Sequence, residues 1–237
     1  MIGWDNESGR VLVLDSYGGS VLRCRLDPTG LVPYEQVVGT EWRPAYMCSW
    51  PGHDGIVFSG IDPVSSVAGV YWRRPGAATD SLLFAPSGSE VLAPRFSFTA
   101  DGQHLLLGLN LPVDRTCALV SVPVQPPGVP SVIVTRSHYA IQAEAHPVDP
   151  DLAAFVYHFV GDDTNPPEDI VEIVRLSTGD AMKLNVRTYA LTCYFTRVES
   201  VSWDPTGRNL ALASGAEDGE GGTHRFQLWA FRNVPIE

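Results

Sequence analysis

Two acidic loops are the segments of this sequence best suited to bind a cation or a basic partner. They span Gly161–Asp169 and Gly215–Gly222, and their carboxylates are Asp162, Asp163, Glu168, Asp169, Glu217, Asp218 and Glu220. Clustered oxygen atoms suit Ca²⁺ or a basic protein surface, although neither loop has the alternating ligand spacing of an EF-hand. Gly-rich acidic loops are also often simply solvated. We predict a binding surface here that needs no cofactor, with Ca²⁺ as the one metal considered.

A second set of carboxylates could do acid–base chemistry. Glu144 and Glu199 lie in segments that we predict to be innermost strands of a repeated fold, whereas Asp5 and Asp204 lie in turns at the opposite end. Five-bladed glycosidases place a pair of carboxylates on such strands, about 5–10 Å apart. No motif supports a pair here, and carboxylates in contact with channel water are the simpler explanation.

The familiar catalytic motifs do not occur in this sequence. It has no Gly-x-Ser-x-Gly elbow, HExxH, P-loop or Rossmann fingerprint. Among the histidines, His158 and His224 flank the acidic loops, while His146 stands where other repeats have Trp or Phe and is predicted to pack. Aromatic residues beside arginine, at Tyr71–Arg74 and Trp229–Arg232, are typical of protein interfaces and equally of packing between sheets. We predict no catalytic residue.

The charge balance argues against nucleic acid as a partner. The 237 residues include 16 Lys and Arg against 27 Asp and Glu, a net charge of −11, whereas a phosphate backbone requires clustered cations. No run approaches the roughly 20 apolar residues of a membrane helix, and no signal peptide is recognisable. We expect a protein partner, no nucleic acid and no membrane. Reduced thiols are expected at the widely spaced cysteines, which favours the cytoplasm; they are Cys24, Cys48, Cys117 and Cys193.

An internal repeat is the strongest signal in the sequence. Five segments share an aromatic residue or His, a polar turn rich in Asp and Gly, and then an apolar run; they begin at Trp4, Trp50, Phe98, His146 and Trp203. Their spacing of 46 to 57 residues is close to the period of propeller blades, about 40–50 residues. Asp-Gly turns join antiparallel strands. We predict one all-β domain over 1–237, a β-propeller of about five four-stranded blades near 1–40, 41–86, 87–135, 136–187 and 188–237.

The two terminal repeats look incomplete. Only Met1–Trp4 precede the first turn, which leaves almost no first strand, and the last repeat ends after Phe226–Phe231, which matches a third strand. Propellers usually close by combining strands from both termini, so that no sheet edge stays open. We expect either a piece of a longer propeller or a homodimer in which terminal strands complete each other.

Two of the turns resemble known propeller repeats. The segments Phe98–Leu105 (Phe-Thr-Ala-Asp-Gly-Gln-His-Leu) and Trp203–Leu210 (Trp-Asp-Pro-Thr-Gly-Arg-Asn-Leu) resemble repeats of TolB-like proteins and of prolyl-oligopeptidase N-terminal domains. The repeat at His146 departs from the pattern, with Pro150-Asp151 where Asp-Gly is expected. The resemblance implies a propeller that serves as scaffold, gate or docking surface, and it carries over no catalytic residue.

The sequence thus favours a soluble, acidic, non-enzymatic propeller that binds a protein or a small ligand. Two alternatives stay open. One is an accessory propeller domain of a larger hydrolase, which a longer parent reading frame would favour. The other is a glycosidase-like propeller enzyme, which a central pocket with two facing carboxylates would favour.

Overall fold

The computed structural model describes residues 2–5, 10–15, 19–28, 30–159, 168–184, 195–217, 224–232 and 234. Within these residues the chain forms strands and one short 3₁₀ turn, with no α-helix. It divides into two compact units, Met1–Gly88 and Ser89–Glu237. No helix in the described ranges is long and apolar enough to cross a membrane. The all-β class is confirmed, while the single domain over 1–237 stays a prediction.

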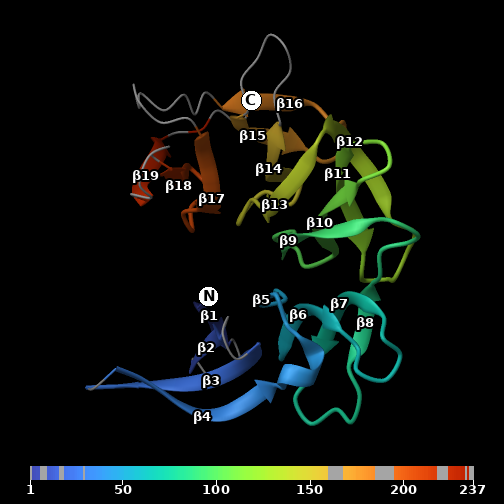
Figure 1. Ribbon diagram of the computed structural model, residues 1–237, viewed down its shortest axis with the longest axis vertical. Helices are drawn as coiled ribbons and strands as arrows, with labels where there is room; N and C mark the ends of the chain where they lie inside the picture. The colour runs from blue at the N-terminus through green and yellow to red at the C-terminus, as the bar shows by residue number, and fades with distance from the viewer. Residues whose placement is uncertain are drawn as a thin grey trace. The chain divides into compact units, whose positions relative to one another are not determined.

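The first unit consists of two four-stranded antiparallel sheets, in which strands adjacent in sequence are hydrogen-bonded (Figure 1). This meander is the strand order of a propeller blade. The 3₁₀ turn η1 (Thr40–Trp42) separates the two sheets. The first sheet contains β1 (Ile2–Asp5), β2 (Arg10–Asp15), β3 (Ser20–Asp27) and β4 (Gly30–Val38), and the second contains β5 (Tyr46–Cys48), β6 (Ile56–Ile61), β7 (Ala68–Arg73) and β8 (Ser81–Phe84).

The second unit contains an eight-stranded sheet and a three-stranded sheet. The eight strands are two four-stranded meanders, β9–β12 and β13–β16, joined where their first strands pair in parallel at Arg95 and Gln142. The strands are β9 (Val91–Phe98), β10 (His104–Leu111), β11 (Thr116–Pro123), β12 (Ser131–Ser137), β13 (Tyr139–Ala145), β14 (Leu152–Phe159), β15 (Glu168–Arg175), β16 (Ala181–Leu184), β17 (Phe195–Trp203), β18 (Asn209–Glu217) and β19 (His224–Arg232).

The middle strands of the meanders β9–β12 and β13–β16 are buried on both faces. Strand β14 is buried from Leu152 through Tyr157, and β15 is buried from Asp169 through Val174. A sheet with one solvated face would instead alternate buried and exposed residues. The continuous apolar runs of the sequence therefore reflect sheets that are covered on both sides within this unit. Small residues at Ala143, Ala153 and Ala154, each 0% exposed, allow close packing there.

Side chains also connect the first strand of one meander to the preceding meander in the second unit. The Asn110 amide on β10 accepts a hydrogen bond from Ala140 N on β13 at 2.7 Å. Ser97 Oγ on β9 donates to Ala143 O at 3.0 Å and accepts from Ala145 N at 2.7 Å. These bonds satisfy backbone groups of β13 that no strand partner covers, and they fix the position of this strand.

The predicted glycine turns are confirmed at the repeat anchors. Gly102 and Gly207 have φ of +67° and +72°, which favours glycine. Near Gly207 a Cβ would lie 2.1 Å from the His146 ring. His146 is 3% exposed, its Nε2 donates to Gly207 O at 2.8 Å, and its Nδ1 accepts from Asp149 N at 2.8 Å. The packing role predicted for His146 fits this environment.

The terminal strands differ from the sequence-based prediction at one end. The chain before the first turn does form a strand, because β1 pairs with β2 from Ile2 opposite Val13 to Asp5 opposite Arg10. At the other end β19 is the third strand of its sheet, as predicted. The acidic loops are shorter than predicted, since Glu168 already belongs to β15 and Glu217 still belongs to β18. Cys24 and Cys117 are buried free thiols, as expected of small core residues.

Candidate functional site

A carboxylate with an unusual protonation equilibrium lies on β13, the first strand of its meander. Glu144 is partly buried, and Gln142 Nε2 donates a hydrogen bond to its Oε2 at 3.0 Å. Desolvation raises the pKa of Glu144 to about 7, and the hydrogen bond from Gln142 and the charge of Arg95 only partly oppose this. A carboxyl group with a pKa close to neutral can both accept and donate a proton at physiological pH.

Gln142 connects this carboxylate to the next sheet. Its side chain is 2% exposed, its Nε2 donates to Val201 O at 2.9 Å and its Oε1 accepts from Val201 N at 3.1 Å. Together with the bond to Glu144, three hydrogen bonds therefore involve the side-chain amide of Gln142. The two bonds to Val201 fix the Gln142 rotamer against β17. Residues two apart on a strand share a face, which brings Gln142 and Glu144 together. Gln142 thereby holds the Glu144 carboxylate in one orientation.

Arg95 supplies positive charge beside the same carboxylate. It lies on β9, directly opposite Gln142 in the parallel pairing of β9 with β13. Its side chain is partly exposed, and its charge lowers the pKa of Glu144 by less than desolvation raises it. Three first strands, β9, β13 and β17, thus contribute Arg95, Glu144 and the backbone of Val201 to one place. A base beside a guanidinium group is suited to remove a proton from an anionic substrate.

The other catalytic carboxylates considered from the sequence do not join this place. The side chains of Glu199 and Asp5 lie outside the described residues, although their backbones are in β17 and β1. Asp204 closes its own turn, with Asn209 Nδ2 donating to its Oδ2 at 2.7 Å. Desolvation alone would raise the pKa of Asp204, but hydrogen bonds from Asn209, Thr206 and Arg208 outweigh it and hold the pKa below its usual range.

Most of the predicted acidic binding surface falls outside the described residues. Asp162, Asp163, Asp218 and Glu220 are not described, nor is the side chain of Glu217. Of the remaining two residues, Glu168 is exposed and pairs with Lys183 Nζ at 2.7 Å, and Asp169 is buried. The acidic surface therefore stays a prediction.

Asp169 forms a buried hydrogen-bonded link. Its side chain is 1% exposed, and one carboxylate oxygen contacts His158 Nδ1 at 2.6 Å. Its other oxygen accepts a hydrogen bond from Val198 N on β17. The carboxylate thus joins β14, β15 and β17, and it sets the orientation of an imidazole that remains 31% exposed. In the sequence, His158 stands out only as a neighbour of the acidic loop.

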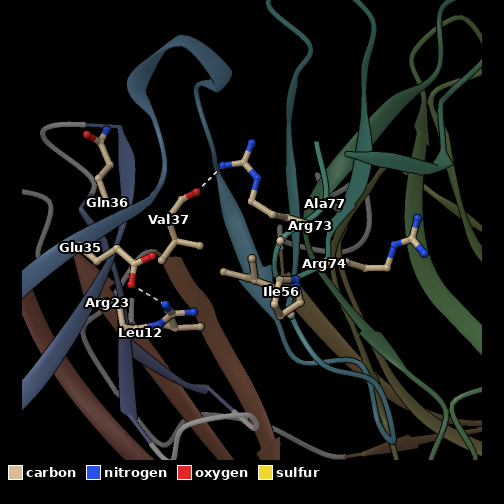
Figure 2. Close-up of a pocket in the computed structure, with 12 residues that line it drawn as sticks. Leu12, Arg23, Glu35, Gln36, Val37, Ile56, Arg73, Arg74 and Ala77 are labelled. Carbon is tan, nitrogen blue, oxygen red and sulfur yellow. Dashed lines mark hydrogen bonds and ion pairs between the residues drawn. The ribbon is translucent and has the colours of Figure 1, made fainter. Parts of the chain in front are cut away.

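The first unit contains a separate hollow of about 330 Å³ between β2–β4 and the β6–β7 end of the second sheet (Figure 2). Arg23 Nη1 pairs with Glu35 Oε2 at 2.5 Å on its wall. Arg73 is fixed by two bonds to the Asp80 carboxylate and one to Val37 O. The volume is at the lower end of the range for small-ligand sites, about 300–1,000 Å³.

Neither place brings together a recognisable set of metal ligands. Among the residues that the structure describes, no group of three or more His, Cys, Asp and Glu side chains lies close enough to hold a metal ion. Around Glu144 the neighbours are an amide and a guanidinium group, and a guanidinium group does not bind cations. No step of the chemistry considered below is routed through a metal.

Comparison with known proteins gives matches in structure alone. A scan against protein-family models found no match, and neither did a search of curated proteins. An oligogalacturonate lyase in complex with manganese has a TM-score of 0.64 and 14% identity over 96% of this chain, which spans 64% of that protein. A second oligogalacturonate lyase, from Vibrio parahaemolyticus, has a TM-score of 0.55 and 10% identity over 97% of this chain and 72% of its own.

A third similar structure is a prolyl endopeptidase, with a TM-score of 0.54 and 10% identity. It aligns with 100% of this chain, but only 36% of that protein is covered. At such low identities the likeness establishes the fold alone, which is propeller-like. The resemblance to TolB-like and prolyl-oligopeptidase repeats stays a prediction. The number of blades and a TolB-like identity are not established by this likeness.

Two predictions are corrected by these neighbours. The expectation of a purely non-enzymatic scaffold is wrong, because the similar structures are enzymes built on such folds. The expectation that no cofactor is involved, with Ca²⁺ as the only metal considered, is also overturned, because one neighbour is a manganese complex. Sequence composition could show neither, since both depend on the fold neighbours.

Proposed function

We propose that this chain is part of a propeller enzyme that acts on acidic oligosaccharides, with Glu144 as the general base. The proposal assumes that the meanders are blades of the predicted propeller of about five blades. It also assumes that the first strand of each blade faces the substrate. The single observation that carries it is the Glu144 carboxyl, held by Gln142 beside Arg95, with a pKa of about 7. A general base works best when its pKa is near the working pH.

The neighbouring charge favours one reaction class, removal of a proton from the carbon next to a carboxylate. In a uronic acid residue this carbon also lies next to the carbon that carries the glycosidic oxygen. Glu144 would take the proton, the C–H electron pair would form a C=C bond, and the C–O bond to the next sugar would break. The departing oxygen takes a proton from water or from Glu144. Arg95 would stabilise the negative charge that develops on the uronate carboxylate.

The substrate class is supported by the fold neighbours and by charge. Two of the similar structures are oligogalacturonate lyases, whose named substrate is a chain of acidic sugars. This chain carries a net charge of −11, so an anionic substrate requires a local cation. Arg95 provides one beside the proposed base.

The test is an elimination assay on oligogalacturonate with the whole chain. We expect the ultraviolet absorbance of the new conjugated C=C bond to rise with the wild type, and Glu144→Gln to lower kcat by at least about a hundredfold. Asp114→Asn, which changes an exposed acid in the β10–β11 turn of the same unit, serves as the matched control. The proposal fails if the wild type forms no unsaturated product, or if Glu144→Gln and the control are equally active.

A second candidate is an accessory propeller of a larger hydrolase. The observation in its favour is that the whole chain aligns with about a third of a prolyl endopeptidase. This alternative predicts no turnover of oligogalacturonate by the wild type and no effect of Glu144→Gln beyond stability. The same assay therefore separates the two candidates.

A further inference from the structure

In the first unit, two turns meet at one end of the sheet β5–β8, beside the hollow described above. The β7–β8 turn Arg74-Pro75-Gly76-Ala77 is closed by a bond from Ala77 N to Arg74 O at 3.2 Å, and Gly76 has φ of +68°. Pro at the second and Gly at the third position are the residues that a type II turn requires. Pro75 restricts the backbone conformation of Arg74, the residue that precedes it.

A glycine brings the neighbouring strands close to this turn. At Gly55, which precedes β6 and has φ of +100°, a Cβ would lie 2.2 Å from Arg73 O. The absence of a side chain at Gly55 lets the Arg73 carbonyl group approach the backbone closely. Gly55, Ile56 and Pro75 all line the 330 Å³ hollow that also contains Arg23 and Glu35.

A second hollow of about 310 Å³ adjoins the first. It is lined by Asp54, Trp72, Arg74 and Pro75, and it shares Arg74 and Pro75 with the first hollow. The two hollows are therefore neighbours on either side of Arg74 and Pro75, and we call the pair of them the arginine groove. In Figure 2 the Arg23–Glu35 pair and the Arg74 side chain lie on opposite sides of Ile56.

The arginines of the groove have different surroundings. Arg73 is partly buried, bonded to Asp80 and Val37 O, and stacked with Trp42 and Phe58, so its charge is already neutralised within the fold. Arg74 is exposed, and among the described residues no carboxylate pairs with it. Its guanidinium carbon lies 5.0 Å from the centre of the Trp72 ring. Arg74 is thus a positioned cation that is available to a ligand.

Trp72 is itself held in place. Its Nε1 donates to Asp54 O at 3.1 Å, and its ring contacts Trp50 at 4.7 Å and His53 at 5.6 Å between ring centres. A guanidinium group over a fixed indole loses less side-chain freedom when it binds an anion. The aromatic cluster therefore serves to orient Arg74.

We propose that the arginine groove binds acidic oligosaccharides, separately from the reaction at Glu144. The Arg74 guanidinium group, held beside Trp72, matches a carboxylate of the ligand. Exposed Glu35 and Gln36 offer partners for hydroxyl groups. The ligand class is taken from the proposed function, so the assignment of acidic oligosaccharides to the groove rests on that function.

The test is calorimetric titration of the whole chain with oligogalacturonate and with its methyl ester, which has the same size and no charge. We expect binding of the acid and none of the ester, and Arg74→Glu should weaken binding of the acid by about tenfold or more. The matched control is Arg25→Glu, which makes the same charge change at an exposed residue of β3 outside the groove and should change binding less than about twofold.

Several results would contradict the binding of acidic oligosaccharides in the arginine groove. They are equal weakening by Arg74→Glu and Arg25→Glu, equal binding of acid and ester, and no binding by the wild type. The proposed function can fail while binding in the arginine groove stands, because the Glu144→Gln variant should still bind the acid with an affinity that depends on Arg74. The groove can fail without the proposed function if Arg74→Glu binds like the control while the wild type still forms unsaturated product.

Discussion

Replacing Glu144 by glutamine should remove the loss of stability that Glu144 causes in the second unit as the pH rises. In the folded protein the pKa of Glu144 is about 7, against an ordinary value of 4.5, because burial disfavours the ionised form. A group whose pKa is raised by folding stabilises the fold fully below its unfolded pKa. That contribution is lost as the pH rises through the folded pKa.

The size of this loss follows from the two pKa values. A difference of about 2.5 units corresponds to about 3 kcal/mol in the free energy of unfolding between pH 4 and pH 8. Glu144 is partly exposed, so water lowers the effect and about 2 kcal/mol is a reasonable expectation. Glutamine stays neutral at every pH and can still accept the bond from Gln142. The Glu144→Gln variant should therefore match the wild type near pH 4 and exceed it by about 2 kcal/mol at pH 8.

The assay is urea unfolding of the wild type, Glu144→Gln and the control Asp114→Asn at several pH values, with near-ultraviolet circular dichroism as the probe. The quantity of interest is the difference in unfolding free energy between wild type and variant as a function of pH. The reasoning about Glu144 is refuted if that difference is constant from pH 4 to pH 8. It is also refuted if the glutamine variant becomes the less stable protein at high pH.

Two further predictions concern the residues that position the first strands of the second unit. Gly207→Ala should destabilise the fold by about 1–3 kcal/mol, because φ is +72° and the new Cβ would meet the His146 ring at 2.1 Å. Urea unfolding measures this change, and a neutral result would contradict the packing described at His146. Asp169→Ala should cost about 2–4 kcal/mol, because Val198 N and His158 lose a buried partner. His158→Gln, which leaves the Asp169–Val198 bond in place, should cost less, and an equal cost would show that the link to β17 is unimportant.

The sequence predicts the strand order because its signals are local. Turns such as Thr99–Gly102 and Trp203–Gly207 require glycine at one position, and the apolar runs between them require strands. Both can be recognised without knowledge of the fold. The first strand β1 was missed because Ile2–Asp5 is only four residues long and lies at the edge of its sheet, where it pairs with β2.

The candidate site could be predicted only in part. Glu144 stands out as a carboxylate on a first strand, but the raised pKa depends on surroundings that come from elsewhere in the chain. Gln142 is 59 residues from its partner Val201, and Arg95 reaches the site through a parallel pairing. No local pattern reports such contacts.

The arginine groove shows the same limit. Arg73 and Arg74 are adjacent and chemically identical, and the sequence treats them alike as arginines beside aromatic residues. The fold separates them, because successive residues at a strand end point to opposite faces. Arg73 is directed to Asp80 and Trp42, whereas Arg74 follows the turn to the surface.

The pH dependence of oligogalacturonate elimination tests the central proposal most directly. The proposal predicts that kcat/KM of the wild type rises with pH through a single ionisation near 7, since Glu144 must be ionised to accept the proton. In Glu144→Gln this rise should disappear together with the activity. A wild type that forms no unsaturated product at any pH, or a glutamine variant that keeps the wild-type profile, would contradict the proposal.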